Sequence, residues 1–171
     1  GKSSTAREVA HRTDSLYIDT GAMYRAVALL SLQRGVDPES KKFGGLIPQI
    51  NITLEQSESG VRVFLNGEDV SALIRSSEVS DMSSRVSKRL DVRNRMVELQ
   101  RQMAAEAMKA GISVVMEGRD IGTVAFPQAQ FKFFLVADPR VRAKRRALQM
   151  KEEGLEADQE ILYKELIERD E

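Results

Sequence analysis

The sequence contains no cysteine and only one histidine, His11, among its 171 residues. The lack of cysteine excludes disulfide bonds, thiolate zinc sites and cysteine nucleophiles, and the lone histidine excludes a multi-histidine metal site. No apolar run approaches the roughly 20 residues that a membrane-spanning helix needs, and nothing resembles a secretory signal peptide. Because the sequence opens on Gly1 rather than methionine, we expect its natural start to lie further upstream.

Net charge is also lacking, because 26 Lys and Arg balance 26 Asp and Glu. A neutral chain gives no expectation of general attraction to nucleic acid or to an anionic membrane. The hydrophobic fraction of 42% and the charged fraction of 30% are ordinary for a globular domain with one core. We therefore expect a soluble, cytoplasmic protein with no nucleic-acid or membrane partner. We also expect a monomer, although composition does not reveal the oligomeric state.

Three short apolar runs, at 16–19, 112–116 and 131–136, predict buried strands. Helical spacing of apolar residues predicts helices between and around these runs, at 3–13, 22–33, 76–110, 139–152 and 159–169. Asp37-Pro38 predicts the start of one more helix, with an N-cap followed by proline in the first turn. Apolar strands that alternate with helices indicate a parallel sheet covered on both faces.

Residues 50–75 have a different character, because apolar and polar residues alternate along 50–54 and 61–65. Turn-forming residues at 58–60 and at Asn66-Gly67 flank the second of these runs. This pattern predicts a small antiparallel hairpin system inserted between helices.

The chemistry is expected where the parallel strands end, because ligands bind there in open α/β sheets. Gly1-Lys2-Ser3-Ser4 matches the second half of the phosphate-loop pattern G-x-x-x-x-G-K-[ST]. In that role Lys2 reaches the outer phosphates and Ser3 reaches Mg²⁺. So short a match is more often coincidence than function.

Two further strand ends carry polar groups. After the first strand, Thr20 and Arg25 could face a phosphate, although a helix cap and a solvated arginine are the favoured explanation of these residues taken alone. After the second strand, Glu117, Arg119 and Asp120 lie among glycines. A carboxylate there can organise the waters of Mg²⁺ and an arginine can clamp a phosphate, so a functional interpretation is favoured.

Three motifs together resemble the bacterial-type cytidylate kinases, a family of nucleoside monophosphate kinases. They are Gly-Lys-Ser-Ser opening a helix, Asp-Thr-Gly-Ala-Met-Tyr-Arg at 19–25 and Glu-Gly-Arg-Asp-Ile-Gly-Thr-Val at 117–124. The last two are specific, and the resemblance covers essentially the whole chain. One departure is Glu117, which is often Asp in relatives.

The resemblance implies a P-loop NTPase-type α/β fold, with helices on both faces of a parallel sheet and a small antiparallel β insert. The first and last core strands are then expected outside these residues. It implies one kinase domain over 1–171, with a core of 1–42 and 105–171. Residues 43–104 would hold the acceptor, and a truncated lid would begin at about 155.

The implied activity is Mg²⁺- and ATP-dependent phosphorylation of CMP and dCMP. By resemblance the catalytic residues are Lys2, Arg119 and Arg169, and the ATP-binding residues are Gly1, Lys2, Ser3, Ser4, Arg142 and Arg146. The acceptor-binding residues are Thr20, Arg25, Ser84, Arg93, Arg119 and Asp120. The metal would be held by Ser3 and, through water, by Glu117.

Other hypotheses stay open at this stage. One is another small P-loop kinase that acts on UMP, AMP or shikimate, and a second is a nucleotide-binding module without turnover. Ser84, Arg93 and Asp120 favour cytosine, because a carboxylate can accept from its N4 amino group while the other two donate to its ring.

Overall fold

The structure is a computed structural model that describes residues 1–57, 60–152, 154 and 156–170. The side chains of Gln149, Glu152, Arg169 and Asp170 lie outside this description. The chain divides into two compact units, residues 1–130 and 131–171, which are described separately below.

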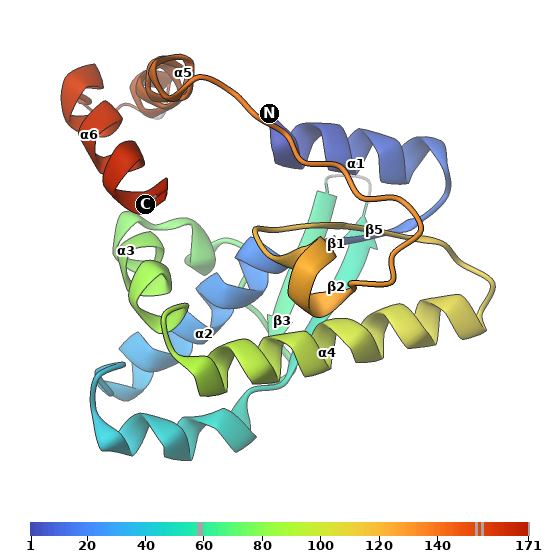
Figure 1. Ribbon diagram of the computed structural model, residues 1–171. Helices are drawn as coiled ribbons and strands as arrows, with labels where there is room; N and C mark the ends of the chain where they lie inside the picture. The colour runs from blue at the N-terminus through green and yellow to red at the C-terminus, as the bar shows by residue number, and fades with distance from the viewer. Residues whose placement is uncertain (58–59, 153, 155, 171) are drawn as a thin grey trace. The chain divides into compact units, whose positions relative to one another are not determined.

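The first unit contains a pair of parallel strands, β1 (Leu16–Asp19) and β5 (Val114–Glu117) (Figure 1). Their register places Asp19 opposite Glu117, so the two carboxyl ends are level. Helices α1 (Lys2–Arg12) and α4 (Leu90–Lys109) both contact the two strands. The predicted parallel pairing and flanking helices are confirmed, and β5 begins two residues later than the apolar run suggested.

Helix α2 (Thr20–Arg34) runs directly out of β1 through the core of this unit. Asp19 caps it by accepting a hydrogen bond from the Ala22 N–H at 2.9 Å. Gly35 ends it in the left-handed conformation, at φ 60°. The apolar positions of α2 are almost fully buried and pack with the inward stripe of α4, which includes Val92, Met96 and Leu99.

The region predicted as helical over 76–110 forms two helices rather than one. Helix α3 (Ser77–Val86) packs on α2, and a short turn at 87–89 separates it from α4. Arg89 occupies this turn, where its side chain bonds the carboxylate of Asp91 and lies over the ring of Phe43, with its guanidinium carbon 4.8 Å from the ring centroid. Gly111 follows α4 at φ 75°, as expected of a residue that stops a helix.

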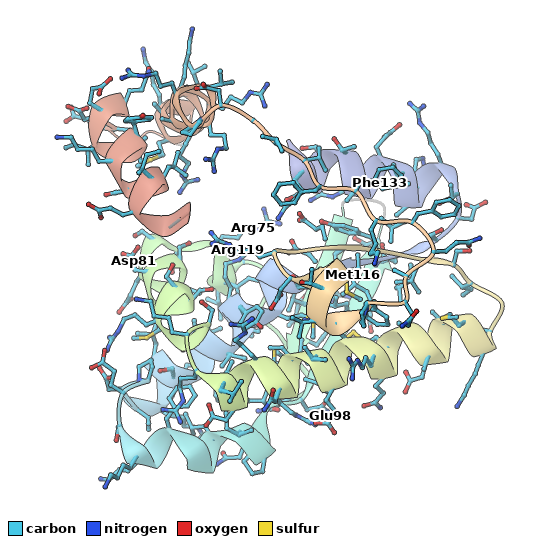
Figure 2. All side chains as sticks on the ribbon, in the orientation of Figure 1. Arg75, Asp81, Glu98, Met116, Arg119 and Phe133 are labelled. Atoms are coloured by element: carbon cyan, nitrogen blue, oxygen red, sulfur yellow. The ribbon has the colours of Figure 1, made fainter. Side chains whose placement is uncertain are left out.

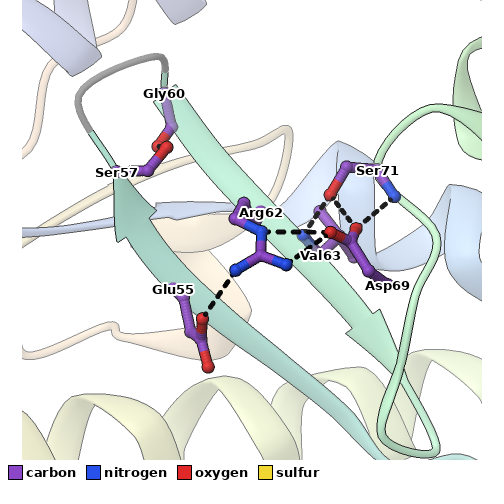
Figure 3. A network of polar contacts seen from close by, with 7 residues as sticks. All are labelled: Glu55, Ser57, Gly60, Arg62, Val63, Asp69 and Ser71. Carbon is purple, nitrogen blue, oxygen red and sulfur yellow. Dashed lines mark hydrogen bonds and ion pairs between the residues drawn. The ribbon is translucent and has the colours of Figure 1, made fainter.

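The predicted insert is a three-stranded antiparallel sheet of β2 (Ile52–Ser57), β3 (Gly60–Leu65) and β4 (Glu68–Asp69). Asn66 and Gly67 form the β3–β4 turn with φ of 53° and 85°. Figure 3 shows Arg62 paired with the carboxylates of Glu55 and Asp69, its neighbours on the strands to either side. The other predicted turn falls at 58–59, outside the described residues.

The prediction of a helix that begins at Asp37-Pro38 is wrong. Asp37 instead closes a turn, because its carboxylate accepts from the Glu39 N–H at 2.7 Å and pairs with Arg85 at 2.7 Å. The next elements are 3₁₀ helices, η1 (Lys41–Gln49), which is capped by Ser40, and η2 (Leu73–Arg75). An aspartate followed by proline suits a turn as well as a helix start, and here the local hydrogen bond decides.

The prediction of a strand at 131–136 is also wrong, because this segment of the second unit forms no strand with any described residue and is highly exposed. Phe133 and Phe134 are 85% and 90% exposed. A strand exists only where another strand completes its hydrogen bonds, and apolar composition does not specify that partner.

The second unit otherwise consists of two helices, as predicted. They are α5 (Pro139–Glu152), whose start Asp138 caps, and α6 (Gln159–Asp170). Arg140 of α5 lies over the Tyr163 ring of α6, with its guanidinium carbon 4.7 Å from the ring centroid.

Candidate active site

The first helix and the end of β5 meet at Lys2 and Glu117, which lie 115 positions apart in the sequence. The Lys2 ammonium donates to the Gly118 carbonyl at 3.1 Å, and it lies 3.6 Å from Oε2 of Glu117. Gly1 precedes α1 as its N-cap, and Ser3 is half-buried in the first turn beside the exposed Ser4. The phosphate-loop motif and the polar end of β5 therefore form one site, at the helix N-terminus that anions favour.

Glu117 is buried and held from two sides. The Tyr17 hydroxyl donates to its Oε1 at 3.0 Å, and the Thr20 hydroxyl donates to its backbone carbonyl at 2.8 Å. Burial, together with the nearby carboxylates of Asp19 and Glu117, raises the pKa of Tyr17 above its usual value. Tyr17 therefore stays a protonated donor at any physiological pH.

The end of β1 places two more candidate residues in the same neighbourhood. Asp19 caps α2 with one carboxylate oxygen, while its other oxygen lies 3.6 Å from the guanidinium of Arg25. Arg25 comes one and a half turns into α2, so the helix turns it back toward its own N-terminus. Thr20 and Arg25, both predicted, are thus brought to the strand ends beside Glu117.

Asp120 lies at the other side of this strand end, where it precedes the single π-helical turn η3 (Ile121–Ala125). Its carboxylate pairs with Arg93 of α4 at 2.5 Å. Burial raises the pKa of Tyr24, with a further contribution from the Asp120 carboxylate, which Arg93 opposes. The predicted pair Arg93 and Asp120 is thus assembled, next to a tyrosine.

Arg101 fixes the far end of η3 with a forked contact. Its Nε donates to the Ala125 carbonyl at 2.9 Å, and its Nη2 donates to the Val124 carbonyl at 3.0 Å. These two bonds tie the segment that follows Asp120 to α4 and so support the position of Asp120.

The other predicted residues come from further segments of the chain. Ser84 is exposed on α3, and no described contact joins its side chain to Arg93 or Asp120. Arg119, labelled in Figure 2, is exposed just after β5. Arg142 and Arg146 belong to α5 in the second unit. Arg169 falls in α6, and its side chain is outside the described residues.

The sequence interpretation missed Tyr17, Asp19, Tyr24 and Arg101. Asp19 had a usable signal, since it is the last strand residue before a helix and lies opposite Glu117 in any in-register pairing. Tyr17 had a weaker signal, because it lies two positions before Asp19 and therefore on the same face of β1. Arg101 had none, because its carbonyl partners depend on tertiary packing.

Metal clusters and membrane-spanning helices are both absent from the described residues. In 1–57, 60–152, 154 and 156–170, no group of three or more His, Cys, Asp and Glu side chains could hold a metal ion. Over the same part of the chain, no helix is both long and apolar enough to cross a membrane.

The parallel strands, the lysine at the start of α1 and the polar strand ends define an α/β phosphotransferase of the P-loop kinase type. Comparison with known proteins gives the particular family. The cytidylate kinase family model matches residues 1–171. The chain belongs to the cytidylate kinase family.

Individual relatives agree with this assignment. A cytidylate kinase of Pelotomaculum thermopropionicum is 46% identical over 172 residues, which cover 99% of this chain and 74% of the relative. One from Pelodictyon phaeoclathratiforme is 47% identical over 180 residues, covering 99% and 73%. One from Shouchella clausii is 41% identical over 172 residues, covering 100% and 74%.

Proposed function

We propose that this chain transfers the γ-phosphoryl group of ATP to CMP and dCMP. The observation that supports this most is the meeting of two sets of residues at one sheet edge. Lys2 and Glu117 would bind a nucleoside triphosphate and its cation. An acceptor nucleotide would be bound by Thr20, Arg25 and the Arg93–Asp120 pair. Membership of the cytidylate kinase family names the acceptor.

The Arg93–Asp120 pair suits cytosine in particular. Asp120 can accept a hydrogen bond from the N4 amino group, and Arg93 can donate to the O2 carbonyl or to the ring nitrogen N3. Uracil carries an acceptor at position 4, which would face a carboxylate unfavourably. We also assign Ser84 of α3 to the same base. This assignment rests on the resemblance alone, because no described contact joins the Ser84 side chain to Arg93 or Asp120.

The acceptor phosphate is assigned to Arg25 and Arg119, with Thr20 close to the nucleotide. Arg25 is held only loosely by Asp19, at 3.6 Å, so a phosphate can replace that carboxylate as its partner. Arg119 follows the end of β5 and is exposed. Two arginines would offset most of the charge of a nucleoside monophosphate.

The residues present fit a magnesium ion carried by ATP. Oε2 of Glu117 is buried and accepts no hydrogen bond from a described residue, so it is available to a cation-bound water. Ser3, in the first turn of α1, would supply a hydroxyl ligand. When bound, Mg²⁺ neutralises charge on the β- and γ-phosphates.

The chemistry needs positioning more than a base. A phosphate oxygen of CMP forms a bond to the γ-phosphorus as the bond to the bridging oxygen of ADP breaks, and ADP leaves. That phosphate oxygen is already largely ionised near neutral pH. Lys2 and Arg119 would stabilise the charge that spreads over the transferred group.

Three further arginines complete the proposal. Arg142 and Arg146 of α5 would contact ATP, and Arg169 would belong to a lid over the donor. We also propose the functional division into a core of 1–42 and 105–171, an acceptor region of 43–104 and a lid from about 155. The family resemblance supports these assignments.

An ADP-release assay tests the proposal. The chain is mixed with ATP, Mg²⁺ and one of CMP, dCMP, UMP or AMP at equal concentration. We expect CMP and dCMP to give at least tenfold higher kcat/KM than UMP or AMP. Equal or faster turnover of UMP or AMP would reject the cytosine assignment, and binding of nucleotides without turnover would reject the kinase activity.

A further inference from the structure

Tyr17 contacts the proposed metal carboxylate but has no place in the function argued so far. Its hydroxyl lies 3.0 Å from Oε1 of Glu117, and the two residues are 100 positions apart in the chain. They share one face of the β1–β5 pair, with Tyr17 two positions before the residue that lies opposite Glu117. The tyrosine side chain bridges this diagonal distance.

Both members of the contact are fixed. Tyr17 is 1% exposed and Glu117 is 8% exposed, so neither side chain can leave the contact for solvent. The backbone carbonyl of Tyr17 also accepts a hydrogen bond from the Gln56 side chain at 3.0 Å, and the Glu117 carbonyl accepts from Thr20. Backbone and side chain are therefore held at both residues.

The contact makes the two oxygens of Glu117 unequal. Oε1 is occupied by the tyrosine hydroxyl, whereas Oε2 is buried, accepts no hydrogen bond from a described residue, and lies 3.6 Å from the Lys2 ammonium. Lys2 gives its own hydrogen bond to the Gly118 carbonyl instead. Oε2 is thus the oxygen of Glu117 that faces the Lys2 ammonium.

We propose that Tyr17 is a positioning residue, which holds the Glu117 carboxylate so that Oε2 faces the nucleotide-bound divalent cation. A glutamate has three side-chain torsions, and a donor that occupies one oxygen removes the rotation that would exchange the two. Partners of this kind commonly change metal affinity or activity by 10- to 100-fold. The inference rests on the proposed function, because it takes Glu117 as the acid that serves the cation.

The test is Tyr17→Phe, which removes the hydroxyl and keeps the buried ring. The main readout is direct binding of Mn²⁺ in the presence of ADP, followed by electron paramagnetic resonance of the free ion. We expect Mn²⁺ to bind about tenfold more weakly than to the wild type. In the ADP-release assay the Mg²⁺ concentration for half-maximal rate should rise similarly, while the KM for CMP stays unchanged.

Ser31→Ala is the matched control. Like Tyr17→Phe, it removes a buried hydroxyl. The Ser31 hydroxyl lies near the far end of α2, where it donates to the backbone carbonyl of Val36 at 2.6 Å. We expect a comparable fall in unfolding midpoint and no change in Mn²⁺ affinity. A loss of Mn²⁺ affinity equal to that of Tyr17→Phe would show a general effect of destabilisation and overturn the proposal.

A double-mutant cycle with Glu117→Gln tests whether the effect passes through Glu117. Adding Tyr17→Phe to Glu117→Gln should weaken the binding of Mn²⁺ no further than Glu117→Gln alone does. Wild-type affinity in Tyr17→Phe, or an equal loss in the Glu117→Gln background, would overturn the positioning role. These outcomes are distinct from failure of the proposed function, which the wild type would reveal by not phosphorylating CMP.

Discussion

Arg93 and Asp120 form an ion pair with 2.5 Å between Nη2 and Oδ2, linking α4 to the turn that follows β5. Both side chains are partly exposed, so the pair adds little to stability by itself. Its value is geometric, since a donor and an acceptor are presented side by side at the sheet edge. Under the proposed function, the carboxylate suits the N4 amino group of cytosine and the guanidinium suits its N3 and O2 acceptors.

Replacing Asp120 with asparagine is expected to relax the choice of base. The amide can turn its NH₂ toward the O4 of uracil, whereas the carboxylate can only accept. Because one good base contact contributes about 1–3 kcal/mol of discrimination, the ratio of kcat/KM for CMP over UMP should fall by about tenfold or more. Initial rates of ADP release with each nucleotide measure this ratio.

Asp14→Asn is the control for loss of one negative charge. Asp14 is exposed in the turn after α1 at φ 47°, a conformation that asparagine adopts equally well. The CMP preference of this variant should equal that of the wild type. An unchanged preference in Asp120→Asn would count against base recognition by Asp120.

Arg119→Ala is expected to lower kcat/KM for CMP by about 10²- to 10³-fold, the usual effect of removing one donor to developing charge. Since Arg119 is exposed, the unfolding midpoint should stay near that of the wild type. Steady-state kinetics and a urea titration measure the two quantities.

Arg12→Ala provides the comparison for this loss of one guanidinium. Arg12 is exposed at the end of α1 and pairs only with Glu8, at 2.7 Å, among the ion pairs of the described residues. It should retain wild-type kinetics. Wild-type turnover in Arg119→Ala would remove Arg119 from the proposed site.

Local pattern in the sequence was enough to locate the strand ends. A run such as 16–19 is apolar, short and followed by a helix signal, so β1 and its capped helix α2 were predictable. The parallel-sheet rule then placed Glu117, Thr20 and Lys2 near one another without any contact being known. The alternation in 50–65 likewise predicted the insert, because half-buried strands repeat every two residues.

What depended on tertiary partners was not predictable. The segment 131–136 has strand composition, but no strand of the described residues pairs with it. Asp37 closes a turn with a hydrogen bond that the sequence does not distinguish from a helix cap. The Tyr17–Glu117 bond depends on the register of β1 against β5, which neither strand encodes alone. Local sequence pattern therefore locates the residues that end a strand more readily than the residues that support a site through tertiary contacts.

The β insert should weaken in acid because of Asp69. Hydrogen bonds from the Ser71 hydroxyl and N–H, followed by that from Arg62, lower the pKa of Asp69 to about 2 (Figure 3). The unfolded value is higher, so the ionised carboxylate stabilises the fold fully above about pH 4, and this contribution is lost as pH falls toward 2.

Asp69→Asn should therefore have a lower unfolding midpoint than the wild type at pH 6, and the gap should narrow steadily between pH 4 and 2. Glu68→Gln, at the neighbouring exposed position of β4, is the matched substitution for loss of one carboxylate. An NMR titration of the Asp69 carboxyl checks the pKa directly. A midpoint near pH 4 would contradict the hydrogen-bonded geometry of the insert.

Gly118 lies where a side chain would not fit. A Cβ there would overlap the Thr20 hydroxyl and fall 2.7 Å from Cδ1 of Ile121. Neither neighbour can move freely, because the Thr20 hydroxyl bonds the Glu117 carbonyl and Ile121 begins η3. Gly118→Ala should therefore destabilise the chain by about 1–3 kcal/mol, the usual effect of overpacking. It should also lower the rate of ADP release with CMP, since the Gly118 carbonyl holds Lys2.

Gly45→Ala is the matched substitution, because nothing lies within 4 Å of the added Cβ in η1. It should unfold at the wild-type urea concentration or slightly above, since alanine reduces the freedom of the unfolded chain. Urea titrations and ADP release are measured for both variants. If Gly118→Ala unfolds and turns over as Gly45→Ala does, the loop after β5 is free to shift. The close approach of Thr20, Gly118 and Ile121 would then not constrain the position of Lys2.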